Sequence, residues 1–123
     1  MMEYVYALTH TYNKMPNRFT FVRSNLLKED FEKLVAFIEF ESDKIDQSYS
    51  VDQEEIAEVL CQLYGATLLP NGRYTDVIEL DQYLNWEKYC SRASEIEKIK
   101  EFHRTDLNVM LEFYIDRYYG SYE

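Results

Sequence analysis

The hydrophobic pattern of this chain changes its period early in the sequence, and this change constrains the fold more than any other feature. Over residues 3–12 the side chains alternate between two faces, and the Tyr, Val and Thr found there favour strands, so this segment predicts a first strand. A proline and two asparagines indicate a loop over 13–18. Residues 19–23 predict a second strand, antiparallel to the first.

Residues 26–41 follow a helical period instead. Apolar side chains recur at i, i+4, i+7, i+8 and i+11 from Leu27, which places them in one stripe. Ser24 or Asn25 is expected to cap this helix at its N-terminus. The polar residues 42–50 are expected to form a connector.

A second helix is predicted after that connector. Ser50 and Gln53 fit the spacing of a capping box. An apolar stripe follows, and Gly65 stands where a left-handed C-terminal cap belongs. We therefore expect the helix to end just before this glycine.

The next segment has two interpretations. A turn at 70–72 separates residues 66–69 from residues 73–80. One interpretation pairs these flanks as a second hairpin, and the other begins a helix at Val77 on a further capping box. We favour the short hairpin, followed by a helix over 81–90.

Two more helices are predicted at 93–103 and 106–119, kept apart because Thr105 and Asp106 resemble a new cap; one kinked helix is the alternative. Strands followed by helices indicate the α+β class. We therefore predict a single domain over 1–123, in which an N-terminal antiparallel β-hairpin, with or without the second short hairpin, packs against four to five helices.

The composition limits the compartment and the class of ligand. The chain has two cysteines and no basic and apolar leader, so reduced thiols in a cytoplasmic protein are expected. Its longest apolar run, Leu34–Ile38, is far too short for a membrane span. A net charge of −10 disfavours direct binding to nucleic acid or to anionic lipid.

Motifs for catalysis, metal binding or cofactor binding are not found in the sequence. We interpret His10 as a strand residue and His103 as a surface residue, because neither has the neighbouring ligands that zinc requires. Cys61 lies in an acidic segment, which is expected to raise its pKa, and Cys90 has basic neighbours but no nucleophile signature. We therefore predict a protein that is not an enzyme and that holds no cofactor or metal.

Negative charge is concentrated in one part of the chain. Residues 29–58 contain eleven acids and two bases, a net charge of −9, whereas residues 95–101 mix both signs. The helix dipole explains acids in the first turn of a helix, but it does not explain Glu54 and Glu58 together, which repel each other across one turn. Such a field favours a positively charged partner.

Two of the three phenylalanines in this acidic region are placed unusually. On a helical wheel Phe37 and Phe40 lie off the main apolar stripe of residues 26–41, and large apolar residues among acids are typical of an interface core with a charged rim. A helix packed on two sides is the alternative. The candidate partner-binding residues are Glu32, Glu39, Glu41, Asp43, Asp46, Glu54, Glu58, Phe37 and Phe40.

These features predict a non-catalytic inhibitor that presents a negatively charged helical surface to the basic, nucleic-acid-binding site of a partner such as a nuclease. A small, acidic, aromatic-rich chain of this kind resembles the phage-encoded anti-defence proteins that mimic nucleic acid (anti-CRISPR-like), and it resembles toxin-immunity proteins equally. The first resemblance implies a location in the host cytoplasm. The alternative is a homodimer or adaptor that buries Phe37 and Phe40 or the tyrosine-rich C-terminus, and a small enzyme comes third.

Overall fold

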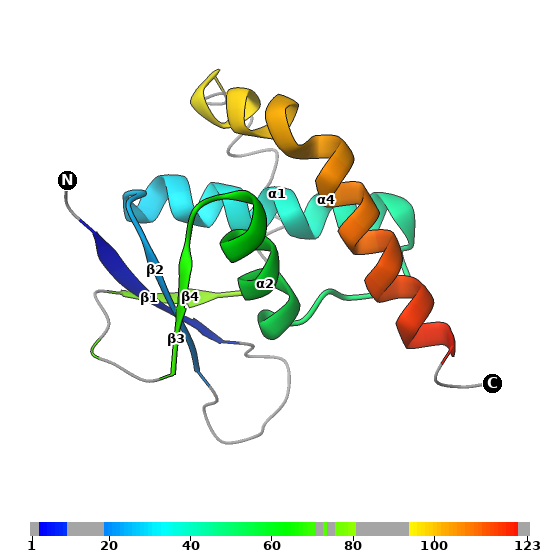
Figure 1. Cartoon of the computed structure of the whole chain (residues 1–123), viewed down its shortest axis with the longest axis horizontal. Helices are drawn as coiled ribbons and strands as arrows, with labels where there is room; N and C mark the ends of the chain where they lie inside the picture. Colours follow the sequence, from blue (N-terminus) through cyan, green and yellow to red (C-terminus); the bar gives the residue numbers. More distant parts are fainter. Residues whose placement is uncertain (1–2, 10–18, 71–72, 74–75, 81–93, 121–123) are drawn as a thin grey trace.

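The computed structural model describes residues 3–9, 19–70, 73, 76–80 and 94–120, with side chains of the last range described from residue 103 onward. This part of the chain forms four strands and three helices, in the order β1, β2, α1, α2, β3, β4 and α4 (Figure 1). The α+β class is as predicted. The expected number of four to five helices is not, because the described residues form three.

The N-terminal hairpin forms as predicted. Strand β1 (Tyr4–Thr9) pairs antiparallel with β2 (Thr20–Ser24), and Tyr6 lies opposite Val22. Tyr6, Leu8 and Val22 are all buried, and Ala7, whose side chain points to the opposite face of β1, is buried as well.

The predicted second hairpin is wrong. Strand β3 (Thr67–Leu69) pairs antiparallel with β2, whereas β4 (Asp76–Glu79) pairs parallel with β1. The order β3-β2-β1-β4 places these two strands at opposite edges of one mixed sheet. The strand interpretation is nevertheless confirmed over residues 76–79, and the helix at Val77 is not formed. In this pairing Ile78 lies opposite Leu8, and both residues are buried.

Helix α1 (Lys28–Ile45) is longer at its C-terminus than predicted. Its N-cap residue is Leu27, which makes no side-chain capping hydrogen bond. Neither Ser24 nor Asn25 occupies this position, and the Ser24 hydroxyl accepts a hydrogen bond from the backbone N–H of Leu26 at 3.1 Å. The acids of the first turn, Glu29 and Asp30, are placed favourably for the helix dipole.

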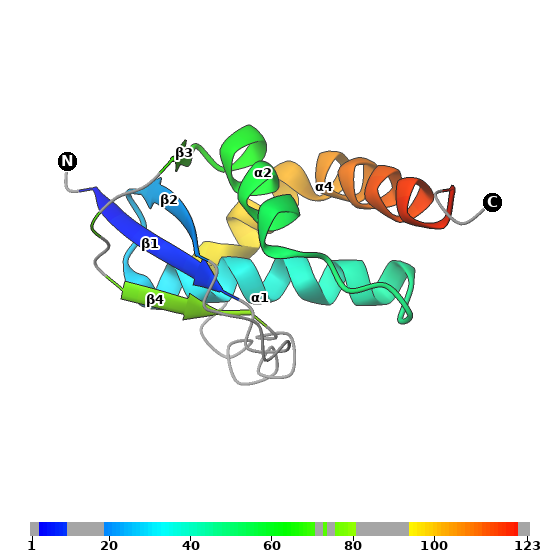
Figure 2. The same ribbon diagram turned by 90° about the horizontal axis from the view of Figure 1, so that it is seen from below.

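Helix α1 is packed on more than one side. The ring of Phe31 stacks on Tyr6 of the sheet with ring centroids 4.2 Å apart. Helix α4 (Ser94–Gly120) crosses α1 away from the sheet (Figure 2). Residues of α1 that would be exposed on a one-sided amphipathic helix are therefore buried, and one hydrophobic cluster joins the sheet to all three helices.

Helix α2 (Gln53–Leu63) begins two residues later than predicted. Its capping box is formed by Asp52 and Glu55, not by Ser50 and Gln53. The side chain of Gln53 is engaged elsewhere, since its amide donates to the hydroxyl of Thr20 at 2.8 Å. The predicted C-terminal cap is confirmed, because Gly65 has a φ of +72°.

Helix α4 is one helix rather than two. The predicted cap at Thr105 does not interrupt it, because the helix is continuous from Ser94 to Gly120, and Leu107, Leu111 and Tyr114 form a buried stripe after that point. The helix predicted over 81–90 lies outside the described residues. Within the described part of the chain, no helix is both long enough and apolar enough to cross a bilayer.

Candidate protein-interaction surface

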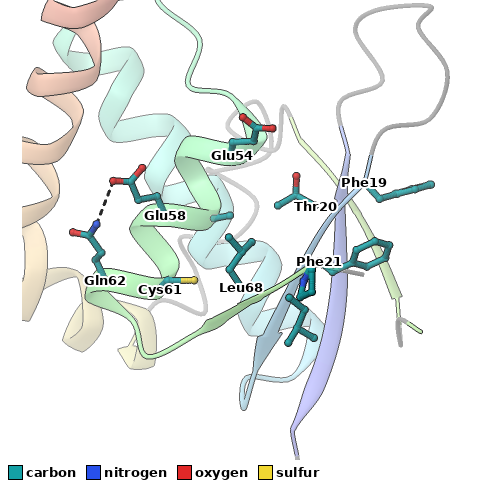
Figure 3. Close-up of a pocket in the computed structure, with 11 residues that line it drawn as sticks. Phe19, Thr20, Phe21, Glu54, Glu58, Cys61, Gln62 and Leu68 are labelled. Carbon is teal, nitrogen blue, oxygen red and sulfur yellow. Dashed lines mark hydrogen bonds between the residues drawn. The ribbon is translucent and has the colours of Figure 1, made fainter. Parts of the chain in front are cut away.

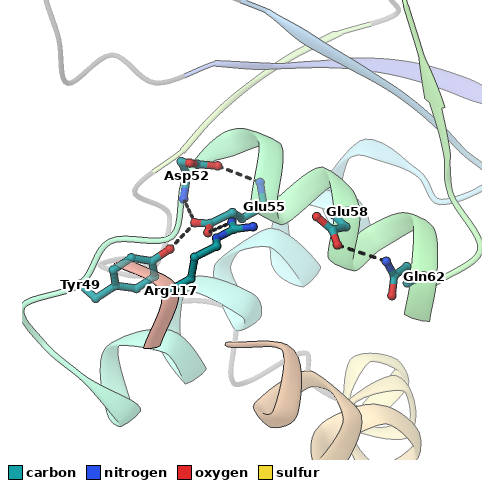
Figure 4. Close-up of polar contacts among 6 residues, drawn as sticks. All are labelled: Tyr49, Asp52, Glu55, Glu58, Gln62 and Arg117. Carbon is teal, nitrogen blue, oxygen red and sulfur yellow. Dashed lines mark hydrogen bonds and ion pairs between the residues drawn. The ribbon is translucent and has the colours of Figure 1, made fainter. Parts of the chain in front are cut away.

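Glu55 is a structural residue of the acidic region. Its carboxylate is buried, and it accepts hydrogen bonds from the hydroxyl of Tyr49 and from the backbone N–H of Asp52 (Figure 4). The guanidinium of Arg117, on α4, lies 3.1 Å from its second oxygen. Burial, followed by the hydrogen bond to Glu55, raises the pKa of the Tyr49 hydroxyl. These contacts join α2, α4 and the segment between α1 and α2.

Glu41 is also engaged within the chain. Its buried carboxylate lies 3.1 Å from the guanidinium of Arg104 and 3.7 Å from the ammonium of Lys44. Burial raises the pKa of Tyr64, and the negative charge of Glu41 raises it further. This candidate partner-binding residue therefore belongs to the packing of α1 against α4.

The acids at the start of α1 pair with bases of the same region. Lys33 lies 3.4 Å from Glu29, and Lys28 lies 3.7 Å from Glu32. Lys28 also lies 3.2 Å from Asp76 at the edge of the sheet. Glu29 and Glu32 in the first half of this helix therefore each have a lysine nearby, so this half does not present the unopposed negative face that the sequence predicts.

The acids in the second half of α1 and after it also face their own chain. Glu39 is buried, and with the half-buried Asp43 it lines a small cavity of about 40 Å³. Asp46 accepts a hydrogen bond from the backbone N–H of Ser48 at 2.8 Å, and its hydrogen bond to Tyr119 raises the pKa of that hydroxyl. The structure therefore does not gather these three residues into one exposed surface.

The interpretation of Phe37 as an interface anchor is wrong in this structure. Phe37 is fully buried in the core, because α1 is packed on more than one side. Phe40 is half-buried, packs against the core, and has the ammonium of Lys44 5.3 Å from its ring centre. The alternative that was left open, a helix with two packed sides, is the one observed.

Glu54 and Glu58 differ from these acids. Both are exposed and lie one turn apart on α2. Glu58 accepts a hydrogen bond from the neutral amide of Gln62 at 3.2 Å, and burial, followed by the negative charge of Glu58, raises the pKa of Tyr114 on α4. These two carboxylates are the members of the predicted set that the structure presents together on one helical face.

An open groove lies beside these two carboxylates, between α2 and the β2–β3 edge of the sheet (Figure 3). Its volume is about 730 Å³, which is within the range of natural ligand sites. Leu68 lines it and is 56% exposed. The groove is lined by Phe19, Thr20, Phe21, Glu54, Ala57, Glu58, Cys61, Gln62, Leu68, Leu69 and Pro70.

The groove has apolar walls and an acidic rim. Figure 3 shows Leu68 pointing toward α2, Glu54 near the start of that helix, and Glu58 farther along it beside Gln62. The two sides of the groove are joined at one end, because the side chain of Gln53 at the start of α2 is hydrogen-bonded to Thr20 of β2.

Sequence reasoning missed both the groove and the bases that compensate the acidic region. Arg104 and Arg117 lie far along the chain from Glu41 and Glu55, so no local pattern indicated their pairing. Leu68 alone could not indicate the groove, since a leucine in a three-residue edge strand does not reveal whether a helix covers it.

The residues considered for chemistry do not form a site in the described part of the chain. His103 packs edge-on against the ring of Tyr64 with centroids 5.1 Å apart. Burial raises the pKa of Cys61, which is the predicted direction with a different cause. No group of three or more His, Cys, Asp or Glu residues suited to a metal ion occurs among the described residues. His10 and Cys90 lie outside them.

Comparisons with known proteins give no relative from which a function could be transferred. No family model, curated protein or solved structure matches the chain. The proposals that follow rest on the residues and contacts described above.

Proposed function

We propose that this chain is a non-catalytic inhibitor that docks the outer face of α2 on a basic surface of another protein. The observation that carries this proposal is the exposure of Glu54 and Glu58 one helical turn apart. Residues one turn apart on a helix are separated by about 6 Å along its axis. The helix thus offers two negative charges at a fixed spacing.

The helix that carries these charges is well ordered by its contacts. Its first turn has a complete capping box, and the side chain of Gln53 joins it to β2. Glu55, one residue from Glu54, is fixed by Tyr49 and Arg117. A rigid display of charge reduces the entropy lost on binding, and the net charge of −10 accelerates the approach of a cationic partner.

The partner of this proposal is a protein with a basic, nucleic-acid-binding site, such as a nuclease. Sites of that kind bind regularly spaced negative charge, and two carboxylates on one rigid helix can occupy part of them. A nuclease of a bacterial defence system and a nuclease toxin are both targets with this chemistry. Either target places the protein in the cytoplasm, which is the host cytoplasm if it is phage-encoded.

The test begins with capture of a partner from the native host on the immobilised full chain, followed by purification of that partner. We expect its binding to weaken steeply with salt and to be displaced by a DNA or RNA oligonucleotide. The double variant Glu54→Gln/Glu58→Gln should weaken it at least about tenfold. Glu112→Gln/Asp116→Asn, which removes two exposed charges from α4, is the matched control.

Two results would contradict the proposed function. One is a partner that binds equally well at low and high salt and is indifferent to nucleic acid. The other is equal loss of binding in the α2 and α4 double variants, since a general effect of net charge would then replace a site on α2.

A second candidate function, a homodimer or adaptor, is favoured by a different surface. Val109 and Phe113 lie one turn apart on α4 and are 62% and 60% exposed. Large apolar residues in such an arrangement are typical of helix-mediated contacts. Sedimentation equilibrium of the full chain tests it: self-association that Phe113→Asp abolishes and Leu27→Asp preserves would support this candidate, and a monomer at all concentrations would contradict a homodimer.

A further inference from the structure

The groove beside α2 adds a feature that a purely electrostatic binder does not need. Leu68, Ala57 and the strand residues form apolar walls, and Glu54 and Glu58 lie on the helix that bounds them. Leu68 is 56% exposed although it points toward α2, because the groove keeps it accessible. An accessible apolar hollow is a place where a partner gains affinity by burying a side chain.

We propose that this groove binds a cationic amphipathic segment of the partner protein, with an apolar side chain in the groove and Lys or Arg side chains on Glu54 and Glu58. The inference deepens the proposed function and rests on it, because both use the outer face of α2. It names the chemistry of the partner segment: an apolar anchor with basic residues on either side.

The charge at the rim decides the class of the occupant. A phosphate group of nucleic acid or of an anionic lipid would be repelled by the carboxylates of Glu54 and Glu58 and by the net charge of the chain. A Lys or Arg side chain is attracted by the same groups, and its aliphatic stem can cover apolar surface such as Leu68. A basic and apolar protein segment satisfies both parts of the surface.

The two parts would contribute differently to binding. The carboxylates accelerate association and confer salt dependence, whereas burial of an apolar side chain slows dissociation and is insensitive to moderate salt. A partner that uses both is expected to retain measurable affinity at salt concentrations that abolish a purely ionic contact.

The inference can be tested before any natural partner is known. A phage-displayed library of random dodecapeptides is selected on the immobilised full chain. The expected peptides combine one or two Leu, Phe, Met or Trp residues with flanking Lys or Arg. Synthetic peptides of the enriched sequences are then titrated against the wild-type protein and its variants by calorimetry.

Leu68→Asp and Leu27→Asp form a matched pair of variants. Leu27 is 59% exposed, almost the same as Leu68, but it does not line the groove. We expect Leu68→Asp to weaken peptide binding at least about tenfold and Leu27→Asp to change it less than about twofold. The new carboxylate at position 68 would attract basic residues more strongly, so a loss of affinity reports the apolar anchor.

The outcomes separate this inference from the proposed function. If Glu54→Gln/Glu58→Gln weakens binding of the natural partner while Leu68→Asp leaves both partner and peptide binding intact, the proposed function stands and the groove inference fails. If Leu68→Asp abolishes peptide binding but the Glu variants bind the natural partner normally, the proposed function fails.

Three further results would overturn the inference. They are the absence of any enriched peptide, enrichment of peptides without basic residues, and self-association of the full chain that depends on Leu68. The last of these would make a second copy of the chain the occupant of the groove. Far-ultraviolet circular dichroism of both leucine variants establishes that they fold.

Discussion

Arg117 on α4 places its guanidinium 3.1 Å from the carboxylate of Glu55 on α2, although the two residues are 62 positions apart in the chain. Arg104 makes an equivalent contact with Glu41 of α1. The last helix therefore supplies positive charge to the acidic middle of the sequence. Glu41 and Glu55 are buried in these contacts, whereas Glu54 and Glu58 are exposed on α2.

Removal of the Glu55 carboxylate should destabilise the fold. Glu55→Ala loses the reciprocal half of the capping box, the acceptor for Tyr49 and the partner of Arg117. We expect the free energy of unfolding to fall by about 2–4 kcal/mol in urea titrations. Arg117→Ala should cost only about 1 kcal/mol, because its side chain is more than half exposed.

Glu54→Ala is the control for this prediction. Glu54 lies in the same first turn but is exposed, so its removal should change the unfolding free energy by less than about 0.5 kcal/mol. Similar losses at positions 54 and 55 would show that the two acids act through the helix dipole alone, and that the buried network does not stabilise the protein.

The fold should lose stability at alkaline pH through its buried tyrosines. Burial, then the charge of Tyr4 and of nearby carboxylates, raises the pKa of Tyr6 to about 12. A tyrosine in the unfolded chain ionises near pH 10, so above that pH the unfolded state releases a proton that the folded state retains. The stabilisation by this group is complete below pH 10 and is lost as the pH rises toward 12.

Urea titrations at pH 8, 9.5 and 11 measure this loss. One such tyrosine contributes a slope of up to about 1.4 kcal/mol per pH unit above pH 10. The pKa values of Tyr49, Tyr64 and Tyr114 are raised as well, so the total slope should exceed that of one group. Tyr6→Phe should reduce this slope by the contribution of one tyrosine. A slope that Tyr6→Phe leaves unchanged would mean that Tyr6 ionises normally in the folded protein.

Truncation of Phe37 and of Phe40 on α1 should distinguish a core side chain from a peripheral one. Phe37 is fully buried, so Phe37→Ala should cost about 3–5 kcal/mol of unfolding free energy. Phe40 is half-buried, and Phe40→Ala should cost no more than about 2 kcal/mol, including its contact with Lys44. Equal effects in thermal or urea unfolding would contradict the two-sided packing of α1.

The local features of the fold could be predicted from the sequence because they depend on neighbouring residues. The alternation over β1 and β2 gave the hairpin, and the apolar stripes gave α1 and α2. Gly65 was recognised because a left-handed cap requires a backbone conformation that glycine adopts without strain. The capping box of α2 was misplaced by two residues, since Ser50 and Asp52 both have suitable side chains and the contact of Gln53 with Thr20 decides between them.

The features that depend on distant residues could not be predicted. The parallel pairing of β4 with β1 brings together segments about 70 residues apart, and a four-residue strand carries no signal for its neighbour. The pairing of Glu41 with Arg104 follows from the position of α4, and Phe37 is buried in the cluster that joins the sheet to the three helices. A charge pattern along the sequence therefore overstates the acidic surface, because compensation comes from another helix.

Helix α1 should become more stable if its N-terminus is given a side-chain cap. Leu27 occupies the N-cap position with an extended backbone, φ −64° and ψ 157°, and makes no capping hydrogen bond. Its side chain is 59% exposed, so little apolar burial is lost when it is replaced. In Leu27→Ser the hydroxyl can accept a hydrogen bond from a backbone N–H of the first turn, and we expect the unfolding free energy to rise by about 0.5–1.5 kcal/mol. Leu27→Ala removes the same side chain without supplying an acceptor, so it separates the cap from the loss of leucine. If the serine variant is no more stable than the alanine variant in urea titrations, the first turn of α1 has its donors satisfied in another way and the missing cap does not limit stability.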